Sequence, residues 1–319
     1  MKQFSLAYKI ILFFSILILS VVSIIVAYTF IEAETIIETQ ITKDLTAIAE
    51  ATEGQIFMFF EKTKTLSSSW SSDGIVRQTV EAIVKDGDRS AVGSLNDHLV
   101  KNKLPLDKSV VVADVLNKDM YVIASSDSKR IGNLEEEHQE GKSLEDLISM
   151  QYGESMISSV RTEKEEDYHP DYPVFHALSP IKSSAGDTLG FLLLHFASSE
   201  LDKIVVGEWQ VSQGALSGQE FIFNQKTSEM FLVNRDGFMI TRSRFKEDSV
   251  LKQKVDNPAT RACFDNNEEY EGSYVGYLGR EVYVSTMCLV VYDTVLLTEI
   301  GTEEIFASLI EEIIAYCWD

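Results

Sequence analysis

The feature that most constrains this chain is an apolar segment near its N-terminus, from Ile10 to Ile31, that contains no charged residue. As a helix, these 22 residues would span about 33 Å, enough to cross the hydrocarbon core of a bilayer. A soluble core helix is rarely apolar on all faces over this length. A cleaved signal peptide usually has a shorter apolar run, and no A-x-A cleavage site follows here. The sequence therefore predicts an uncleaved membrane anchor.

The charges that flank this segment predict its orientation. Lys2 and Lys9 precede the anchor, whereas Glu32 and Glu34 follow it. Basic residues are retained on the cytoplasmic side of a membrane. We therefore expect residues 1–9 to form a cytoplasmic tail, and the bulk of the chain to lie outside the cytoplasm in a single-pass topology.

Length and charge restrict the remaining possibilities. A chain of 319 residues exceeds what one hydrophobic core usually serves, so two folded units are expected. The net charge is -22, with 50 acidic and 28 basic residues, which disfavours a nucleic-acid partner because phosphate would be repelled. The densest acidic cluster could hold a cation, but such runs are usually exposed helix faces. Its members are Glu135, Glu136, Glu137 and Glu140.

Beyond the anchor, residues 32–70 are expected to form a long stalk helix. Ile37, Ile41, Leu45 and Ile48 recur at three- and four-residue spacing, which places them on one face of that helix. This apolar stripe needs a cover. We interpret the stripe as the contact surface of a parallel homodimer, in which the same stripe of a second copy covers it. The alternative is that the stripe packs against the chain's own second unit.

After two further helices, at about 75–85 and 90–101, the apolar period changes to that of strands. A strand–turn–strand unit is expected at 109–127 and again at 230–243. The remaining elements are expected as helices near 143–159, at 201–208 and from Pro258, and as strands at 173–181, 188–196, 272–277, 280–290 and 294–300.

The two strand–turn–strand units indicate an internal repeat. Val112 in the first and Val233 in the second lie 121 residues apart. Neither half shows the strict strand–helix alternation of a parallel sheet. The predicted fold is therefore α+β: two tandem modules, at 71–205 and 206–307, each with an antiparallel sheet flanked by helices.

Four stretches in this order, behind an anchor, make residues 30–307 resemble the double Cache sensor domains of bacterial and archaeal receptors. The stretches are VIASSDSKRIGN (122–133), LSPIKSSAGDTLGFLLLHF (178–196), FLVNRDGFMITRSRF (231–245) and YVGYLGREVYVSTMCLVVYDTVLLTEIGTEEIF (274–306). The resemblance implies a stalk helix that bears a membrane-distal and a membrane-proximal PAS-like module, each five-stranded. It also implies a small-molecule ligand in the distal module of a chemoreceptor, sensor kinase or cyclic-dinucleotide enzyme.

Within that family, the amino-acid-binding branch carries an Arg-x-Trp-Tyr string and an Asp on the last distal strand. The string is absent from residues 100–200, and His195 stands where the Asp would fall. These groups would pair an α-carboxylate and an α-ammonium. An α-amino acid ligand is therefore disfavoured.

Five residues on or beside the distal strands are candidates for binding a ligand: His195, His176, Tyr172, Tyr168 and Arg161. An imidazole such as that of His195 can donate or accept a hydrogen bond and titrates near neutral pH. Each candidate also has an ordinary structural interpretation. The histidine would bond to a nearby backbone group, the tyrosines would cover a core edge, and Arg161 would lie on a solvated face.

No catalytic or metal-binding pattern emerges from the chain. There is no HExxH spacing, G-x-S-x-G elbow, Walker loop or dinucleotide fingerprint. We expect neither enzyme activity nor a cofactor. A surface interaction or structural protein built from tandem PAS-like modules is the alternative to a receptor.

Cys263 and Cys288 fall in the second module, and an oxidising compartment would allow them to form a disulfide. Two separate buried thiols are the alternative, and Cys317 is expected to stay unpaired. Residues 308–319 are interpreted as the start of a truncated or incomplete return to the membrane, because Glu311 and Glu312 interrupt the last apolar stretch.

Overall fold

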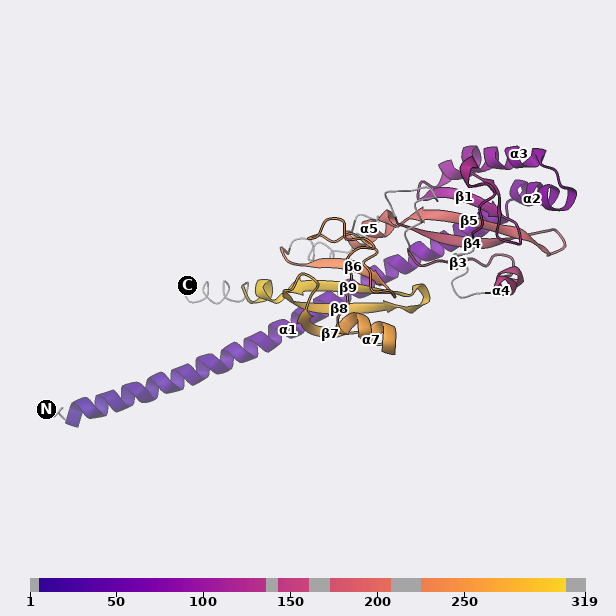
Figure 1. The fold of residues 1–319 in the computed structure, drawn as a ribbon. Coiled ribbons are helices and arrows are strands. Elements are labelled where there is room, and N and C mark those ends of the chain that lie inside the picture. Colours follow the sequence, from indigo (N-terminus) through magenta and orange to yellow (C-terminus); the bar gives the residue numbers. More distant parts are fainter. Residues whose placement is uncertain (1–5, 136–142, 161–172, 208–224, 308–319) are drawn as a thin grey trace.

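The computed structural model describes residues 6–135, 143–160, 173–207 and 225–307. Its first element, α1 (Leu6–Ser71), is one continuous helix of 66 residues, about 99 Å long. Figure 1 shows that α1 leaves the N-terminus and then runs along two successive sheets. The predicted anchor and stalk are therefore parts of the same helix.

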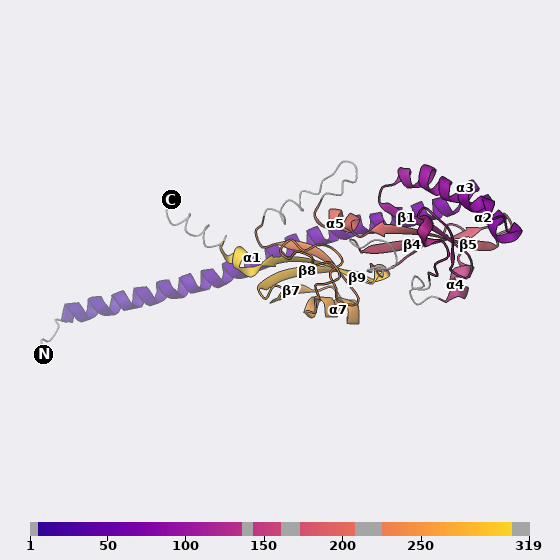
Figure 2. The same cartoon turned by 45° about the horizontal axis from the view of Figure 1, so that its top comes forward.

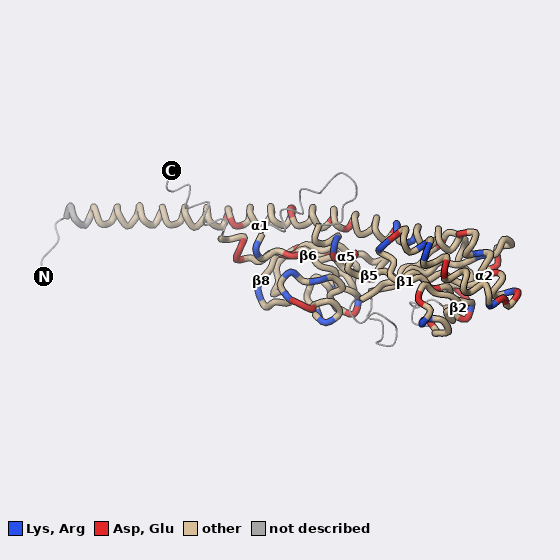
Figure 3. Tube along the Cα trace, turned by 90° about the horizontal axis from the view of Figure 1, so that it is seen from above, with Lys and Arg blue, Asp and Glu red and all other residues tan. Residues whose placement is uncertain are grey.

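From Ile10 to Ile31, α1 carries no charged side chain. Residues 10–32 are exposed on all sides, and Figure 3 shows no charged residue along this part until the first acidic positions. In the described part of the chain, α1 alone is long and apolar enough to cross a membrane. Side chains of this kind are stable in hydrocarbon and not in water.

The distal module is built on a five-stranded antiparallel sheet in the order β2-β1-β5-β4-β3. Together with α1, the helices α2 and α3 lie on one side of this sheet, and α4 lies on the other (Figures 1 and 2). The elements are α2 (Gly74–Asp86), α3 (Ser90–His98), a π-helical turn (Leu99–Lys103), a 3-10 turn (Leu104–Leu106), β1 (Val110–Leu116), β2 (Val122–Ser125), a 3-10 turn (Ser128–Arg130), α4 (Leu144–Ser149), β3 (Met156–Ile157), β4 (Val174–Lys182) and β5 (Thr188–Ala197).

Local signals fix where the helices begin and end. Asp73 caps α2 by accepting hydrogen bonds from the backbone N–H groups of Ile75 and Val76. Gly87 ends α2 in a left-handed conformation, with φ of 68°. The helix predicted at 143–159 is wrong beyond Ser149: the chain turns there and residues 156–157 join the edge of the sheet as β3.

The proximal module has a four-stranded antiparallel sheet in the order β6-β9-β8-β7 among the described residues. It follows the connecting helix α5 (Ser199–Val205) and lies between α1 and α7 (Figure 1). Its elements are β6 (Glu229–Asn234), α7 (Pro258–Asn266), β7 (Glu271–Val275), β8 (Glu281–Leu289), a 3-10 turn (Val290–Tyr292) and β9 (Thr294–Gly301), and residues 302–307 continue as a helix.

The expected fifth proximal strand, in the second half of 230–243, is not formed. Gly237 turns the chain at φ of 81°, and Phe238 and Met239 make only single bridges. Met239 also exchanges backbone hydrogen bonds with Gln253 and Leu251, while the backbone N–H of Ile240 donates to Leu232 of β6, so the contact with β6 stays limited to isolated bonds. The prediction of tandem antiparallel modules flanked by helices is otherwise confirmed, while the boundary between residues 205 and 206 stays a prediction.

The stripe on the stalk helix packs within its own chain. Leu45 is fully buried and Ile48 is 5 % exposed, and Ile37 and Ile41 pack against the same core. That core includes proximal-sheet residues such as Met287. The interpretation of this stripe as the contact surface of a dimer is therefore wrong. A homodimer stays a prediction, but this stripe does not support it.

Cys263 on α7 and Cys288 on β8 are joined by a disulfide, with their Cα atoms 5.6 Å apart. The bond closes a loop of 25 residues, which stabilises by about 3–4 kcal/mol in the entropic model. Disulfides of this kind persist mainly in oxidising compartments, which agrees with the predicted extracytoplasmic location of the module.

We therefore expect the full chain, denatured without reduction, to expose one reactive thiol, that of Cys317. Labelling with a maleimide and counting the added mass checks this. Cys263→Ser is the control, because it should add the thiol of Cys288 as a second label. Three labels on the unsubstituted chain would contradict the disulfide.

Candidate functional site

The distal sheet has two different faces. Along β1, Ala113 and Val115 point into the core shared with α1, whereas Asp114 points to the opposite face. On that opposite face, one end is apolar: Leu116 and Phe191 belong to a small core that includes Leu147 of α4. The other end of the same face is polar, and we consider it the candidate site.

The polar end is organised around Asp114, whose side chain is fully buried. Nε of Arg130, from the short turn after β2, donates to Oδ2 of Asp114 over 2.7 Å. A second guanidinium nitrogen of Arg130 donates to Glu135 over 2.7 Å. Arg130 is 2 % exposed and Glu135 7 % exposed, so these ion pairs are buried. Removing one partner would leave an uncompensated buried charge.

Two histidines extend this cluster along the sheet. Nε2 of His195 on β5 lies 2.9 Å from Oδ2 of Asp114, and because a carboxylate can only accept, Nε2 carries the hydrogen. His176, its direct neighbour on β4, packs edge-on with ring centroids 4.5 Å apart. The hydroxyl of Ser158 lies 3.2 Å from Nδ1 of His176. The cluster thus joins β1, β5 and β4 at one end of the sheet.

The charge state of Asp114 follows from these contacts. Burial alone would raise the pKa of its carboxyl, but the hydrogen bond from His195 and the charges of His195 and Arg130 lower it below the ordinary value. Asp114 is therefore a carboxylate at neutral pH. Its second oxygen, Oδ1, is buried and has no partner at good hydrogen-bond geometry among the described residues, while the hydroxyl of Ser125, opposite Asp114 on β2, also helps to lower the pKa. Such an oxygen carries unused capacity to accept a hydrogen bond.

The structure brings together two of the five residues proposed from sequence. His195 and His176 are 2 % and 3 % exposed and belong to the cluster. Nε2 of His195 bonds to a side chain, that of Asp114. The other three, Arg161, Tyr168 and Tyr172, lie outside the described residues.

Sequence reasoning missed Asp114 and Arg130 and misjudged Glu135. Glu135 was read as part of an exposed acidic run, but it is buried against Arg130 because the guanidinium needs a second counter-charge. The available signal was Asp114 itself, a lone charge in the apolar strand VVVADVL. A charge at such a position requires a buried partner.

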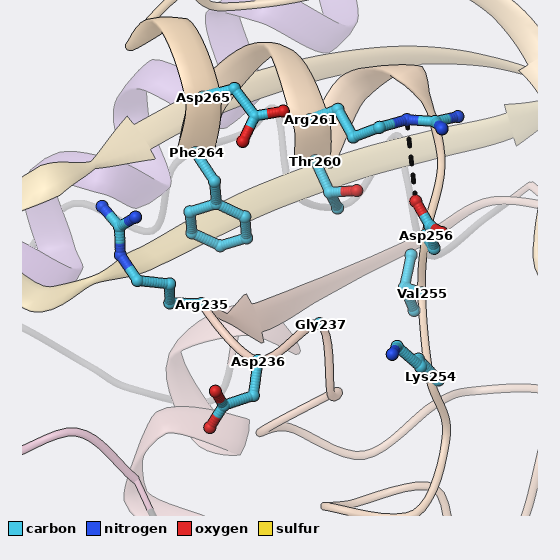
Figure 4. Close-up of a pocket in the computed structure, with 10 residues that line it drawn as sticks. All are labelled: Arg235, Asp236, Gly237, Lys254, Val255, Asp256, Thr260, Arg261, Phe264 and Asp265. Atoms are coloured by element: carbon cyan, nitrogen blue, oxygen red, sulfur yellow. Dashed lines mark ion pairs between the residues drawn. The ribbon is translucent and has the colours of Figure 1, made fainter.

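A hollow of about 200 Å³ lies in the proximal module between α7 and the turn after β6. Figure 4 shows Phe264 at one wall, with Arg235 beside it and Arg261 directed toward Asp256. Its ion pairs are exposed: Arg261 and Asp256 are 61 % and 66 % exposed and 3.6 Å apart. Exposed pairs of this kind contribute little binding energy. No group of residues suited to hold a metal ion occurs in the described part of the chain.

Fold and site together define a class: an apolar N-terminal helix that continues into two tandem PAS-like modules, with a buried polar cluster in the distal one. Solved sensory domains of bacterial receptors have this fold. The chain is similar to the periplasmic sensory domain of the Campylobacter jejuni chemoreceptor Tlp1 (TM-score 0.54, 14% identity, 85% of this chain and 98% of that one). It is also similar to the sensor domain of the Vibrio cholerae histidine kinase DctB (TM-score 0.56, 12% identity, 83% and 98%).

A third similar structure is the ligand-binding domain of the Pseudomonas fluorescens chemoreceptor CtaA in complex with L-isoleucine (TM-score 0.50, 11% identity, 86% of this chain and 98% of that one). No family model matches the sequence, and no curated protein matches it. The structural likeness confirms the sensor-domain fold that the sequence resemblance implied.

Proposed function

We propose that this protein is the extracytoplasmic ligand-sensing portion of a membrane-anchored signalling receptor, and that a small solute binds in the distal module beside Asp114. The observation that carries the proposal is the buried Oδ1 of Asp114, for which the described residues supply no well-aligned hydrogen bond and only the nearby hydroxyl of Ser125. The fold shared with receptor sensory domains and the apolar start of α1 support the same function.

The site favours a ligand that donates hydrogen bonds. A carboxylate oxygen in a place of low dielectric gains most from an N–H or ammonium donor. The complex of CtaA with L-isoleucine supports small-molecule binding by this fold. Because the Arg-x-Trp-Tyr string is absent here, we propose an amine or amide solute other than an α-amino acid.

A thermal-shift screen of amines, purines and carboxylates on the full chain in detergent tests this function. A solute at 100 times its Kd should stabilise the protein by about 2.7 kcal/mol and raise its Tm. Asp114→Asn, which keeps the shape and removes the charge, should lose most of that shift. Asp97→Asn on the exposed end of α3 is the matched control and should keep it.

If no solute raises the Tm, the alternative of a structural or interaction protein is favoured. If a solute stabilises the wild type and Asp114→Asn equally, the binding site lies elsewhere.

A further inference from the structure

The proximal module contains a buried acidic pair that ligand sensing in the distal module does not use. Glu229 on β6 and Glu299 on β9 are direct partners in the sheet register. They are 2 % and 3 % exposed. By alternation along β9, Glu299 shares the face of Val295 and Leu297, which is the face covered by α7 and turned away from α1.

This position matches that of the distal cluster. Strands β6 and β9 pair in the proximal sheet as β1 and β5 pair in the distal one. Glu299 stands third from the end of β9, and His195 stands third from the end of β5. Both modules therefore carry ionisable groups at the same end of the same pair of strands, on the sheet face opposite α1.

Neutral donors hold the two carboxyl groups in place. The hydroxyl of Tyr274 on β7 donates to Oε1 of Glu299, and Asn257 in turn donates to that hydroxyl over 2.9 Å. The hydroxyl of Tyr277 donates to Oε1 of Glu229. Oε2 of Glu229 accepts from the hydroxyl of Ser243 over 3.1 Å and, at 3.2 Å, from the backbone N–H of Arg244.

Cationic compensation for the pair is incomplete. The cation whose charge acts on both glutamates is Arg280, in the turn between β7 and β8. One of its terminal nitrogens donates to the carbonyl of Thr227 over 2.8 Å. Its Nε–H is buried and finds no acceptor among the described residues. One guanidinium group therefore acts on two carboxyl groups, and its Nε–H can still donate a hydrogen bond.

The electrostatics of the pair favour a proton. Burial, and secondarily the charge of Glu229, raises the pKa of Glu299 to about 8, against the hydrogen bond from Tyr274. Burial also raises the pKa of Glu229. The folded protein thus binds a proton that the unfolded chain releases near the ordinary value of 4.5. The stabilising contribution of this proton is complete below about pH 4.5 and is lost as pH rises through about 8.

The same contacts lead to the C-terminal helical residues 302–307. Thr227, which Arg280 holds through its carbonyl, donates its backbone N–H to Glu304 over 2.7 Å. Its hydroxyl also donates to Glu304 and accepts from the backbone N–H of Gly301, the last residue of β9, over 3.0 Å. A shift of Arg280 would therefore move the contacts that fix the start of this helix.

We propose that the proximal module is a second, proton-binding input of the receptor, in which external pH sets whether Glu299 carries its proton and Arg280 and Thr227 pass the change to residues 302–307. On loss of the proton, two adjacent buried carboxylates repel each other and attract the spare donor of Arg280. The two carboxylates then compete with the carbonyl of Thr227 for the guanidinium group of Arg280. As a result, the hydrogen bonds between Thr227 and Glu304 weaken.

The test uses the full chain in nanodiscs. Spin labels are placed at the exposed positions Gln40 on α1 and Glu303 through Gln40→Cys and Glu303→Cys, in a Cys317→Ser background without reductant. Electron–electron distances and thermal unfolding are then measured from pH 5 to pH 9.5. We expect the distance distribution to change with a midpoint near pH 8, and the Tm to fall from pH 5 to about pH 8 and to level off above it.

Glu299→Gln is the decisive variant, because an amide has the shape of the protonated acid and still accepts from Tyr274. It should keep the low-pH distance throughout and lose this part of the Tm decline. Glu281→Gln, an exposed glutamate on β8, is the control and should titrate like the wild type. A pH-independent distance in the wild type, or an unaltered transition in Glu299→Gln, would overturn the proposal.

Discussion

Asp114→Ala should be among the most destabilising single substitutions in the distal module, with an expected loss of about 3–5 kcal/mol. The substitution deletes the acceptor of Nε of Arg130 and of Nε2 of His195 at once. Arg130 would keep Glu135 but lose the counter-charge of Asp114 at a buried position. Chemical denaturation of the full chain in detergent micelles, followed by circular dichroism, measures the effect.

The matched control for this prediction is Asp97→Ala on α3. Asp97 also forms an ion pair, with Lys101 at 2.6 Å, but both side chains are 67 % exposed. Its loss should change the free energy of unfolding by about 0.5 kcal/mol or less. Equal effects of the two substitutions would show that the Asp114 cluster is not a buried ion-pair network.

Phe60→Ala should cost about 3–5 kcal/mol, because it removes the aromatic ring that joins the two modules on α1. Phe60 is 5 % exposed, stacks on Tyr292 of the proximal module at 4.1 Å and meets Phe175 of β4 edge-on at 5.6 Å. Aromatic pairs of this geometry add to the burial of their area. A single unfolding transition in the wild type should separate into two in the variant.

Phe57, one turn earlier on α1, provides the control because it is 53 % exposed. Phe57→Ala should change stability by no more than about 0.5 kcal/mol. If the Phe60 and Phe57 variants unfold alike, the modules are not coupled through this contact.

The local elements of this fold could be predicted well from sequence, because their apolar periodicity is strong. Strands β4, β5, β8 and β9 lie within one or two residues of the expected ranges. The failures have physical reasons. In 143–159 a capping box at Ser143 indicates a helix, and Gly153, at φ of 88°, is a local sign that it ends, but nothing local indicates that Met156 then pairs with Leu178. Pairing is a long-range choice that a local pattern does not contain.

The candidate site was only partly predictable for the same reason. His195 and His176 could be placed on strands, but which side chains meet them depends on the register between β1 and β5 and on the turn that brings in Arg130. Glu299 sits in the strand TVLLTEIG at the same alternation as Val295 and Leu297. A charged residue at an inward-facing position indicates either a shifted pKa or a buried partner. The sequence alone does not distinguish a shifted pKa from a buried partner.

The unbroken course of α1 fixes the rotational angle between its apolar N-terminal part and the two modules. Each residue of an α-helix turns the chain by about 100°, and α1 has no interruption between the part exposed on all sides and the part packed on the sheets. Deleting a single residue between Ile31 and Ile37 would therefore present a different side of the anchor to its neighbours in the bilayer while leaving both modules intact. A change in length by seven residues, close to two full turns, would nearly restore the original orientation of the helix. Any fusion of this sensor to another anchor has to match angle as well as length.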